Sequence, residues 1–362
     1  SLGRELRRLN SEQPLVFITA DDGSSYSKPM LSNALAQGKD AQALVIADAE
    51  KMRTSLDATI MTGTRVEQID AKGRRLYAAG EWHEYGSLVM ATGAKPIHIP
   101  YAGEGADDLI SVNSLSDYAS YRERLGTAGR VAIIGPGLIG CEFANDLLSQ
   151  GKQVSVIGPD AYPISTLLPQ EVGLSLQSTL QKQGVDWHLG TVVEAINRTD
   201  DGYLLALKDG SQVDADLVVS AVGLVPDIHL ATETGLDTNR GIRVDSSLKS
   251  SLPGIYALGD CAEVDGVNLP FVMSLMLGAK ALAKTLAGEG TAVNYPVMPV
   301  VIKTPACPVV AVPPPRGVEG AWDIDRSSGG VKALFHSADK ELVGFALCGS
   351  RVDEKAELLQ LM

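Results

Sequence analysis

The segment from residue 130 to residue 160 constrains the fold of this chain more than any other part. It reads RVAIIGPGLIGCEFANDLLSQGKQVSVIGPD. An apolar run is followed by three glycines at G-x-G-x-x-G spacing, an amphipathic stretch and a second apolar run. This order predicts a βαβ unit that carries a dinucleotide-binding fingerprint. The three glycines are Gly135, Gly137 and Gly140.

Each glycine has a physical role in such a unit. Gly135 permits the tight turn, Gly137 lets the backbone approach a pyrophosphate, and Gly140 lets the helix pack on the strand. The free N–H groups and the dipole at the helix start attract phosphate charge. Asp160 lies about 20 residues past Gly140, where an acid binds a ribose hydroxyl and repels a 2′-phosphate. Residues 158–162 contain no Lys or Arg, which favours NADH over NADPH.

Composition excludes several classes of protein. The length of 362 residues is typical of two or three domains. The net charge of −13 argues against nucleic-acid binding, which needs a basic surface. No apolar stretch approaches the ~20 residues that span a bilayer, and no secretory signal pattern is present, so we expect no membrane insertion.

The cysteines indicate the compartment. No two of them stand at C-x-x-C or C-x₄-C spacing, so the sequence predicts no redox disulfide, zinc site or iron–sulfur cluster. Scattered thiols are typical of a reducing environment, which predicts a cytoplasmic protein. The four are Cys141, Cys261, Cys307 and Cys348.

A short internal repeat extends the prediction to two nucleotide-binding domains. Residues 87–94 (SLVMATGA) and 216–223 (DLVVSAVG) each form an apolar run that ends at a glycine turn. From Asn294 onward, short strands interrupted by prolines predict a separate domain. The predicted fold class is therefore α/β, with two Rossmann-like dinucleotide-binding domains and a small C-terminal α+β domain. A loop at Ser27–Pro29 is expected to lead into helical structure up to about Leu56.

An ordered set of motifs covers nearly the whole chain and resembles the flavin- and pyridine-nucleotide-dependent oxidoreductases that have two dinucleotide-binding domains. Within that group, the chain resembles the bacterial rubredoxin reductases most. The motifs are SYSKPMLS (25–32), LVMATGAKP (88–96), GPGLIGCEFANDL (135–147), DLVVSAVGLVPD (216–227), GIYALGDCAEVDG (254–266) and VIKTPACP (301–308).

The resemblance implies a domain organisation and a reaction. The FAD-binding domain would comprise residues 1–112 and 245–293, the NAD-binding domain 113–244, and the C-terminal domain 294–362. NADH would pass a hydride to FAD, and the flavin would pass electrons singly to rubredoxin or a similar small iron protein. Three alternatives remain: a ferredoxin reductase or NADH oxidase of the same fold, a non-catalytic NAD-binding protein, and an FAD-deficient fragment.

The resemblance also assigns residues to FAD. Asp260 would bind the ribityl chain, and Thr92 and Gly93 would form a turn against the flavin. Asp21 would hold the adenosine ribose. Lys28 would lie against the isoalloxazine ring, where a cation favours the reduced anionic flavin. Lys303 would lie near the pyrimidine edge of the ring.

Gly135, Gly137, Gly140, Asp160 and Gly223 are assigned to NAD in the same way. Glu142 would face the nicotinamide and the flavin and pair with Lys28, so these two residues are the catalytic candidates. A simpler interpretation of Glu142 is a carboxylate in the first helical turn, stabilised by the helix dipole.

Two further expectations concern the N-terminus and the partner. Residues 14–19 resemble the second strand of a βαβ unit, so its first strand and glycine turn, roughly 15–25 residues, would precede residue 1. A chain that starts at Ser1 is then expected to load FAD poorly. Because rubredoxins are generally acidic, docking to this acidic chain would need a local basic patch, for which the candidates are Lys280, Lys284, Lys303 and Arg316.

Overall fold

The computed structural model describes residues 1–9 and 12–362. By its internal contacts the chain divides into two compact units. Unit 1 comprises Ser1–Tyr26, Val45–Lys95 and Leu224–Pro296, and unit 2 comprises Ser27–Leu44, Pro96–Gly223 and Val297–Met362. The three-domain boundaries given above stay a prediction. Among the described residues, no helix combines the length and apolar character needed to cross a membrane.

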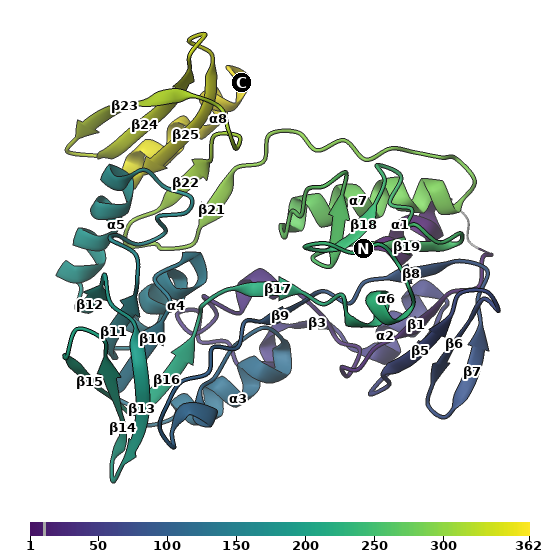
Figure 1. Ribbon diagram of the computed structural model, residues 1–362, viewed down its shortest axis with the longest axis horizontal. Helices are drawn as coiled ribbons and strands as arrows, with labels where there is room; N and C mark the ends of the chain where they lie inside the picture. The colour runs from purple at the N-terminus through teal and green to yellow at the C-terminus, as the bar shows by residue number, and fades with distance from the viewer. Residues whose placement is uncertain (10–11) are drawn as a thin grey trace. The chain divides into compact units, whose positions relative to one another are not determined.

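A four-stranded parallel sheet forms the centre of unit 2 (Figure 1). Helix α4 (Leu138–Leu148) connects the two strands of this sheet that come first along the chain, as the predicted βαβ unit requires. Strands in such a sheet are covered on both faces, which explains why they are continuous apolar runs rather than alternating ones. In sheet order the strands are β12 (Val185–Leu189), β11 (Gln153–Gly158), β10 (Arg130–Ile134) and β16 (Leu217–Ser220).

Two helices and an antiparallel sheet complete this part of unit 2. Helix α3 (Leu115–Leu125) begins with a capping box, in which Ser114 and Asp117 bond each other's backbone N–H. Helix α5 (Gln170–Lys182) precedes β12. The three-stranded sheet shares an apolar core with the parallel sheet. Its strands are β13 (Val193–Thr199), β14 (Gly202–Leu207) and β15 (Gln212–Ala215).

The C-terminal part of unit 2 is a five-stranded antiparallel sheet that ends in the short helix α8 (Lys355–Gln360). Its strands β22 (Val309–Val312) and β25 (Leu342–Cys348) are buried along their length or nearly so, and Phe345 and Leu347 belong to its core. This agrees with the predicted α+β character. In sheet order the strands are β21 (Val300–Ile302), β22 (Val309–Val312), β25 (Leu342–Cys348), β24 (Gly330–Ser337) and β23 (Gly320–Ser327).

Unit 1 is built from short paired strands around one core. Three parallel pairs occur, together with an antiparallel meander of β5 (Val66–Asp70), β6 (Arg75–Ala78) and β7 (Glu81–Glu84). The parallel pairs are β1 (Val16–Ile18) with β4 (Thr59–Met61), β8 (Leu88–Met90) with β19 (Ile255–Ala257), and β18 (Ile242–Val244) with β20 (Ala262–Val264). The helices are α1 (Leu2–Leu9), α2 (Ala49–Leu56), α6 (His229–Glu233) and α7 (Val272–Leu286).

The segment Ser27–Leu44, called the strap below, differs from the sequence prediction. Strands β2 (Ser25–Tyr26) and β3 (Val45–Ala47) pair in antiparallel fashion and bring its two ends together. Only the 3₁₀ turns η1 (Lys28–Met30) and η2 (Gln42–Leu44) and a series of turns lie between them, so the helical structure expected up to Leu56 is confined to α2. The contacts of the strap group it with unit 2, whereas the sequence prediction placed Lys28 in the FAD-binding domain.

Candidate functional site

The glycine loop between β10 and α4 leaves no room for larger residues at two of its three glycines. A side chain at Gly140 would place its Cβ 1.9 Å from the Gly135 carbonyl oxygen. Gly135 has a φ of +113°, and a Cβ there would lie 2.5 Å from the Ala221 carbonyl oxygen. These close approaches bring the start of α4 onto the end of β10, as the fingerprint requires.

Gly137 has a different environment. It is the N-cap residue of α4, no side chain caps the helix there, and no atom lies within 4 Å of its would-be Cβ. A residue without a side chain thus stands at the start of α4, next to first-turn N–H groups that no side chain caps. This arrangement fits the pyrophosphate of a dinucleotide.

The other residues assigned to NAD lie at the same edge of the parallel sheet. Asp160 follows the end of β11, and its carboxylate accepts a hydrogen bond from the Ser165 hydroxyl. Gly223, with a φ of +109°, follows the end of β16, and its carbonyl accepts from Ile97 N at 3.0 Å. The carboxyl edge of a parallel sheet is where such folds bind ligands.

Glu142 is fully buried, and its partners differ from the one expected. The carboxylate accepts hydrogen bonds from Ser32 Oγ at 2.5 Å and from Lys303 N at 2.8 Å. It also forms an ion pair with Lys303 Nζ. Its cationic partner is thus Lys303 and not Lys28, which is exposed on η1. The simpler interpretation also needs correction, because α4 begins at Leu138 and Glu142 lies in the second turn, where the helix dipole has weakened.

Two further polar residues of α4 bind backbone amides far away in the sequence. Asn145 Oδ1 accepts from Ala306 N at 3.1 Å, in the loop after Lys303. Asp146 is 1% exposed and accepts from Ala36 N at 2.7 Å and Leu35 N at 3.1 Å, both in the strap. Neither residue was predicted from the sequence. The available signal was the presence of polar residues in a helix that otherwise reads as buried.

Unit 1 holds four of the residues assigned to FAD. The turn after β8 has Gly93 at a φ of +71°, and Thr92 Oγ1 donates to the Asp227 carbonyl at 2.6 Å. Gly259 has a φ of +83° and precedes Asp260. The Asp260 side chain is half-buried and forms no hydrogen bond with another described residue. A carboxylate of this kind fits a hydroxyl-rich ligand such as the ribityl chain. Asp21 is exposed after β1.

The cysteines offer no reactive thiolate beside these motifs. All four are buried and free, and burial raises the pKa of the Cys261 thiol next to Asp260. The spacing did not reveal that the thiols of Cys307 and Cys348 are joined by a hydrogen bond in the C-terminal part of unit 2.

Comparison with known proteins places the chain in a family. Residues 1–284 match the pyridine nucleotide-disulphide oxidoreductase model, and residues 292–362 match a rubredoxin binding C-terminal domain. A rubredoxin-NAD(+) reductase of Alcanivorax borkumensis is 48% identical over 98% of this chain and 93% of its own length. The rubredoxin-NAD(+) reductase of Acinetobacter baylyi is 44% identical over 97% of this chain and 91% of its own length.

A solved structure gives the same picture. The ferredoxin reductase for the CYP199A2 system of Rhodopseudomonas palustris is 26% identical, with a TM-score of 0.89 over 98% of this chain and 89% of that one. The predicted α/β class with two dinucleotide-binding domains is therefore confirmed. The chain belongs to the pyridine nucleotide-disulphide oxidoreductase family.

Proposed function

We propose that this protein is an NADH-dependent FAD oxidoreductase that reduces rubredoxin. The observation that carries the proposal is the buried Glu142–Lys303 pair. It joins the helix that follows the dinucleotide loop to the region that matches a rubredoxin-binding domain. The rubredoxin-NAD(+) reductases to which the chain is 44–48% identical support the same activity.

FAD, when bound, accepts a hydride from NADH and releases electrons one at a time. In this proposal the side chains bind and orient, and none has to transfer a proton in the hydride step. Gly137 and the start of α4 receive the NADH pyrophosphate. Asp260 binds the ribityl chain. The ion pair with Glu142 fixes the side chain of Lys303, the lysine that the resemblance assigns to the flavin.

The test is NADH-driven reduction of purified rubredoxin by flavin-loaded protein, followed as bleaching of the rubredoxin iron absorbance without oxygen. Ferredoxin and oxygen serve as competing acceptors. Turnover with rubredoxin at least ~10-fold faster than with either supports the proposal. Faster turnover with ferredoxin or oxygen would show that rubredoxin is not the preferred electron acceptor. A flavin that NADH does not bleach would indicate a non-catalytic NAD-binding protein.

The nucleotide preference gives one prediction. The Asp160 carboxylate repels the 2′-phosphate of NADPH, and Ala161 beside it is exposed, so an arginine there has room. The double variant Asp160→Ala, Ala161→Arg is expected to raise the NADPH-to-NADH ratio of kcat/KM by about 100-fold, since it removes a like charge and adds a phosphate ligand. Steady-state kinetics with both nucleotides measure this ratio. Equal use of NADPH and NADH by the parent would contradict the proposed role of Asp160.

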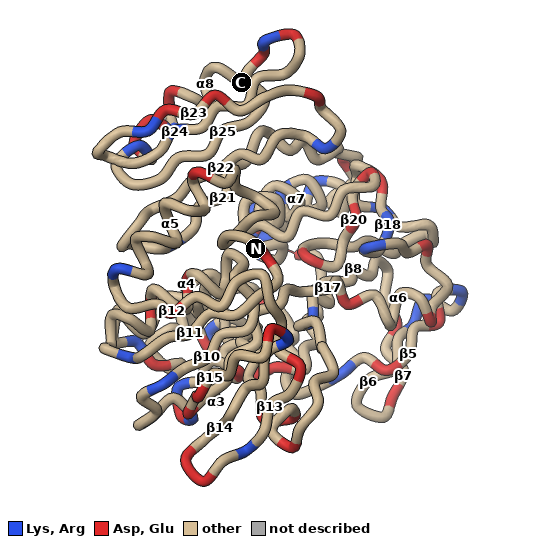
Figure 2. The backbone as a smooth tube through the Cα atoms, turned by 60° about the vertical axis from the view of Figure 1, so that its left-hand side comes forward, with Lys and Arg blue, Asp and Glu red and all other residues tan. Residues whose placement is uncertain are grey.

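The docking of rubredoxin gives another prediction. Lys280 and Lys284 lie one turn apart on α7 and line a groove together with Leu277, Ala292 and Val293. Figure 2 shows basic residues in blue along α7. Neither lysine forms an ion pair with any carboxylate in the described part of the chain. Val272, Met273 and Met276 of the same helix are about half exposed. Apolar contact area beside unpaired lysines suits a small acidic protein.

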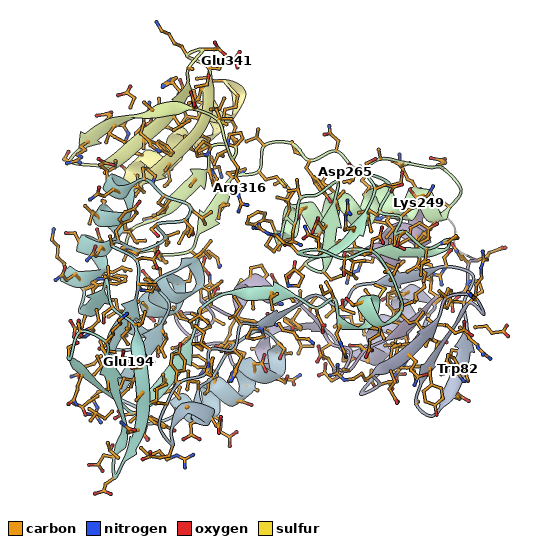
Figure 3. The ribbon with its side chains drawn as sticks, viewed as in Figure 1. Trp82, Glu194, Lys249, Asp265, Arg316 and Glu341 are labelled. Carbon is orange, nitrogen blue, oxygen red and sulfur yellow. The ribbon has the colours of Figure 1, made fainter. Side chains whose placement is uncertain are left out.

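Reversing both charges, Lys280→Glu with Lys284→Glu, is expected to raise KM for rubredoxin about 10-fold or more at low salt. Reduction of the flavin by NADH should not change. Lys249→Glu, an exposed lysine elsewhere on unit 1 (Figure 3), is the matched control. If Lys249→Glu raises KM as much per charge as the α7 variant, the effect reflects net charge and not a docking surface.

A cytoplasmic location is also part of the proposal. It rests on the four free cysteines, which could form disulfides in an oxidising compartment. Two of them, Cys307 and Cys348, are already joined by a hydrogen bond between their thiols. Cell fractionation with an antibody against the protein tests it.

A further inference from the structure

Asp146 is a buried carboxylate that the proposed chemistry does not use. It is 1% exposed, and its two hydrogen bonds go to the backbone amides of Leu35 and Ala36 in the strap. Burial raises its pKa to about 6. The charged and titratable groups around it are Arg122, Tyr118 and Tyr121 of α3 and Glu142 of its own helix.

This carboxylate is costly to bury. The Arg122 guanidinium, the cation near it, donates instead to the Lys39 carbonyl at 2.5 Å. No cation in the described residues forms an ion pair with Asp146. Burying a charge without a paired cation costs more free energy than burying an apolar residue of similar volume. The burial of Asp146 is therefore weak evidence that it stabilises the fold. A role in fixing the geometry of what it binds explains it better.

Residues elsewhere in unit 2 hold the strap at three places. Ser32 Oγ donates to Glu142, the amides at Leu35 and Ala36 donate to Asp146, and the Lys39 carbonyl accepts from Tyr118 Oη at 2.9 Å. Of these anchors only the one at Asp146 binds two consecutive amides, which fixes the direction of the backbone and not merely its position.

Asp146 lies one turn beyond Glu142 on the same face of α4. With a rise of 1.5 Å per residue, Glu142 is roughly 6 Å and Asp146 roughly 12 Å along the helix from the glycine loop. The strap therefore follows α4 away from the dinucleotide loop. Because Ser32 lies only three residues before Leu35, a shift of the amides at Leu35 and Ala36 also moves the Ser32 hydroxyl that bonds Glu142.

We propose that Asp146 is a positioning residue, which holds the strap on α4 so that Ser32 and Glu142 keep their geometry for the transfer of hydride from NADH to the flavin. This role rests on the proposed function.

The first test is hydrogen–deuterium exchange of full-length protein, read in peptides that cover residues 31–39. In Asp146→Ala the amides of Leu35 and Ala36 lose their acceptor, and their exchange should accelerate about 10-fold or more. Asp146→Asn keeps one acceptor oxygen, so the exchange rate of these amides should lie between those of the parent and Asp146→Ala. Asp40→Asn is the matched control, since Asp40 accepts from Ala43 N at 2.8 Å within the strap and belongs to the same residue type.

The second test is the limiting rate of flavin reduction by NADH in single-turnover experiments without rubredoxin. Asp146→Ala should lower this rate about 10-fold and leave the Kd of NADH within about 2-fold. Because two amides lose their acceptor, its thermal midpoint should also fall, so the rates are compared at a temperature at which both proteins are fully folded. A rate within about 2-fold of the parent under those conditions would overturn a positioning role.

Unchanged exchange at Leu35 and Ala36 would also overturn it. If NADH does not bleach the flavin of the parent, the proposed function fails. The exchange experiment then still decides whether Asp146 holds the strap.

Discussion

Replacing Glu142 with alanine is expected to lower stability by about 2–4 kcal/mol and to reduce the rate of NADH-dependent flavin reduction by at least ~100-fold. The substitution leaves the Lys303 ammonium, the Lys303 backbone N–H and the Ser32 hydroxyl without their shared acceptor. The expected loss of stability is smaller than for a fully buried ion pair, because the Lys303 side chain is 27% exposed and its ammonium regains some hydration.

Two variants separate charge from shape at this position. Glu142→Gln keeps an acceptor for the Lys303 N–H, so it should retain most of the stability but still slow flavin reduction about 10-fold. Lys303→Met leaves the Glu142 carboxylate buried without a cation, and it should destabilise the protein more than Glu142→Gln does.

Thermal midpoints and stopped-flow bleaching of the flavin measure the two effects. If Glu142→Ala melts within about 1 °C of the parent, the buried pair does not contribute to stability as argued. If Lys28→Met slows flavin reduction more than Lys303→Met does, the cation that matters is Lys28, as the sequence prediction had it.

Replacing Gly140 with alanine should abolish measurable NADH binding and lower stability by about 1–3 kcal/mol, the usual cost of overpacking. The new Cβ would lie 1.9 Å from the Gly135 carbonyl oxygen, which is backbone and cannot rotate away. The loop or the start of α4 must shift, and the first-turn N–H groups then no longer converge on the pyrophosphate.

Gly137→Ala is the informative counterpart. Its Cβ enters open space and its φ of −76° suits any residue, so the fold should tolerate it with a change in stability below about 1 kcal/mol. The methyl group would nevertheless stand where the pyrophosphate approaches, and NADH affinity should fall about 10-fold or more.

Calorimetric titration with NADH and thermal melting distinguish the two glycines. Gly140→Ala should lose both binding and stability, and Gly137→Ala should lose binding alone. Equal destabilisation by both variants would show that the loop is not packed as described. Unchanged affinity in Gly137→Ala would place the pyrophosphate away from α4.

Local patterns predicted the parts of the fold that depend on neighbouring residues. The run from Arg130 to Ile157 contains the whole strand–turn–helix–strand unit, because apolar periodicity and glycine spacing act over a few residues. The same holds for the glycine turns after β8 and β16. The strands after Asn294 form a sheet of their own, but the prediction that they are short is wrong for β23, β24 and β25, which have 7–8 residues. The helical prediction for the strap is wrong because contacts with distant residues, and not its own periodicity, set its conformation.

Local patterns do not predict which residue pairs with a buried charge. The residue types at Lys28, Glu142 and Lys303 indicated that a carboxylate and a lysine would meet. Nothing local decides between a lysine 114 residues before Glu142 and one 161 residues after it. Tertiary packing buried Glu142 completely, joined it to Lys303 and Ser32, and placed Asp146 under the strap. The sequence by itself therefore determined the dinucleotide fold and its glycine loop, whereas only the tertiary structure decided which side chains satisfy the buried carboxylates. A hydrogen bond depends on atoms meeting in space, and strand and helix patterns do not encode that meeting.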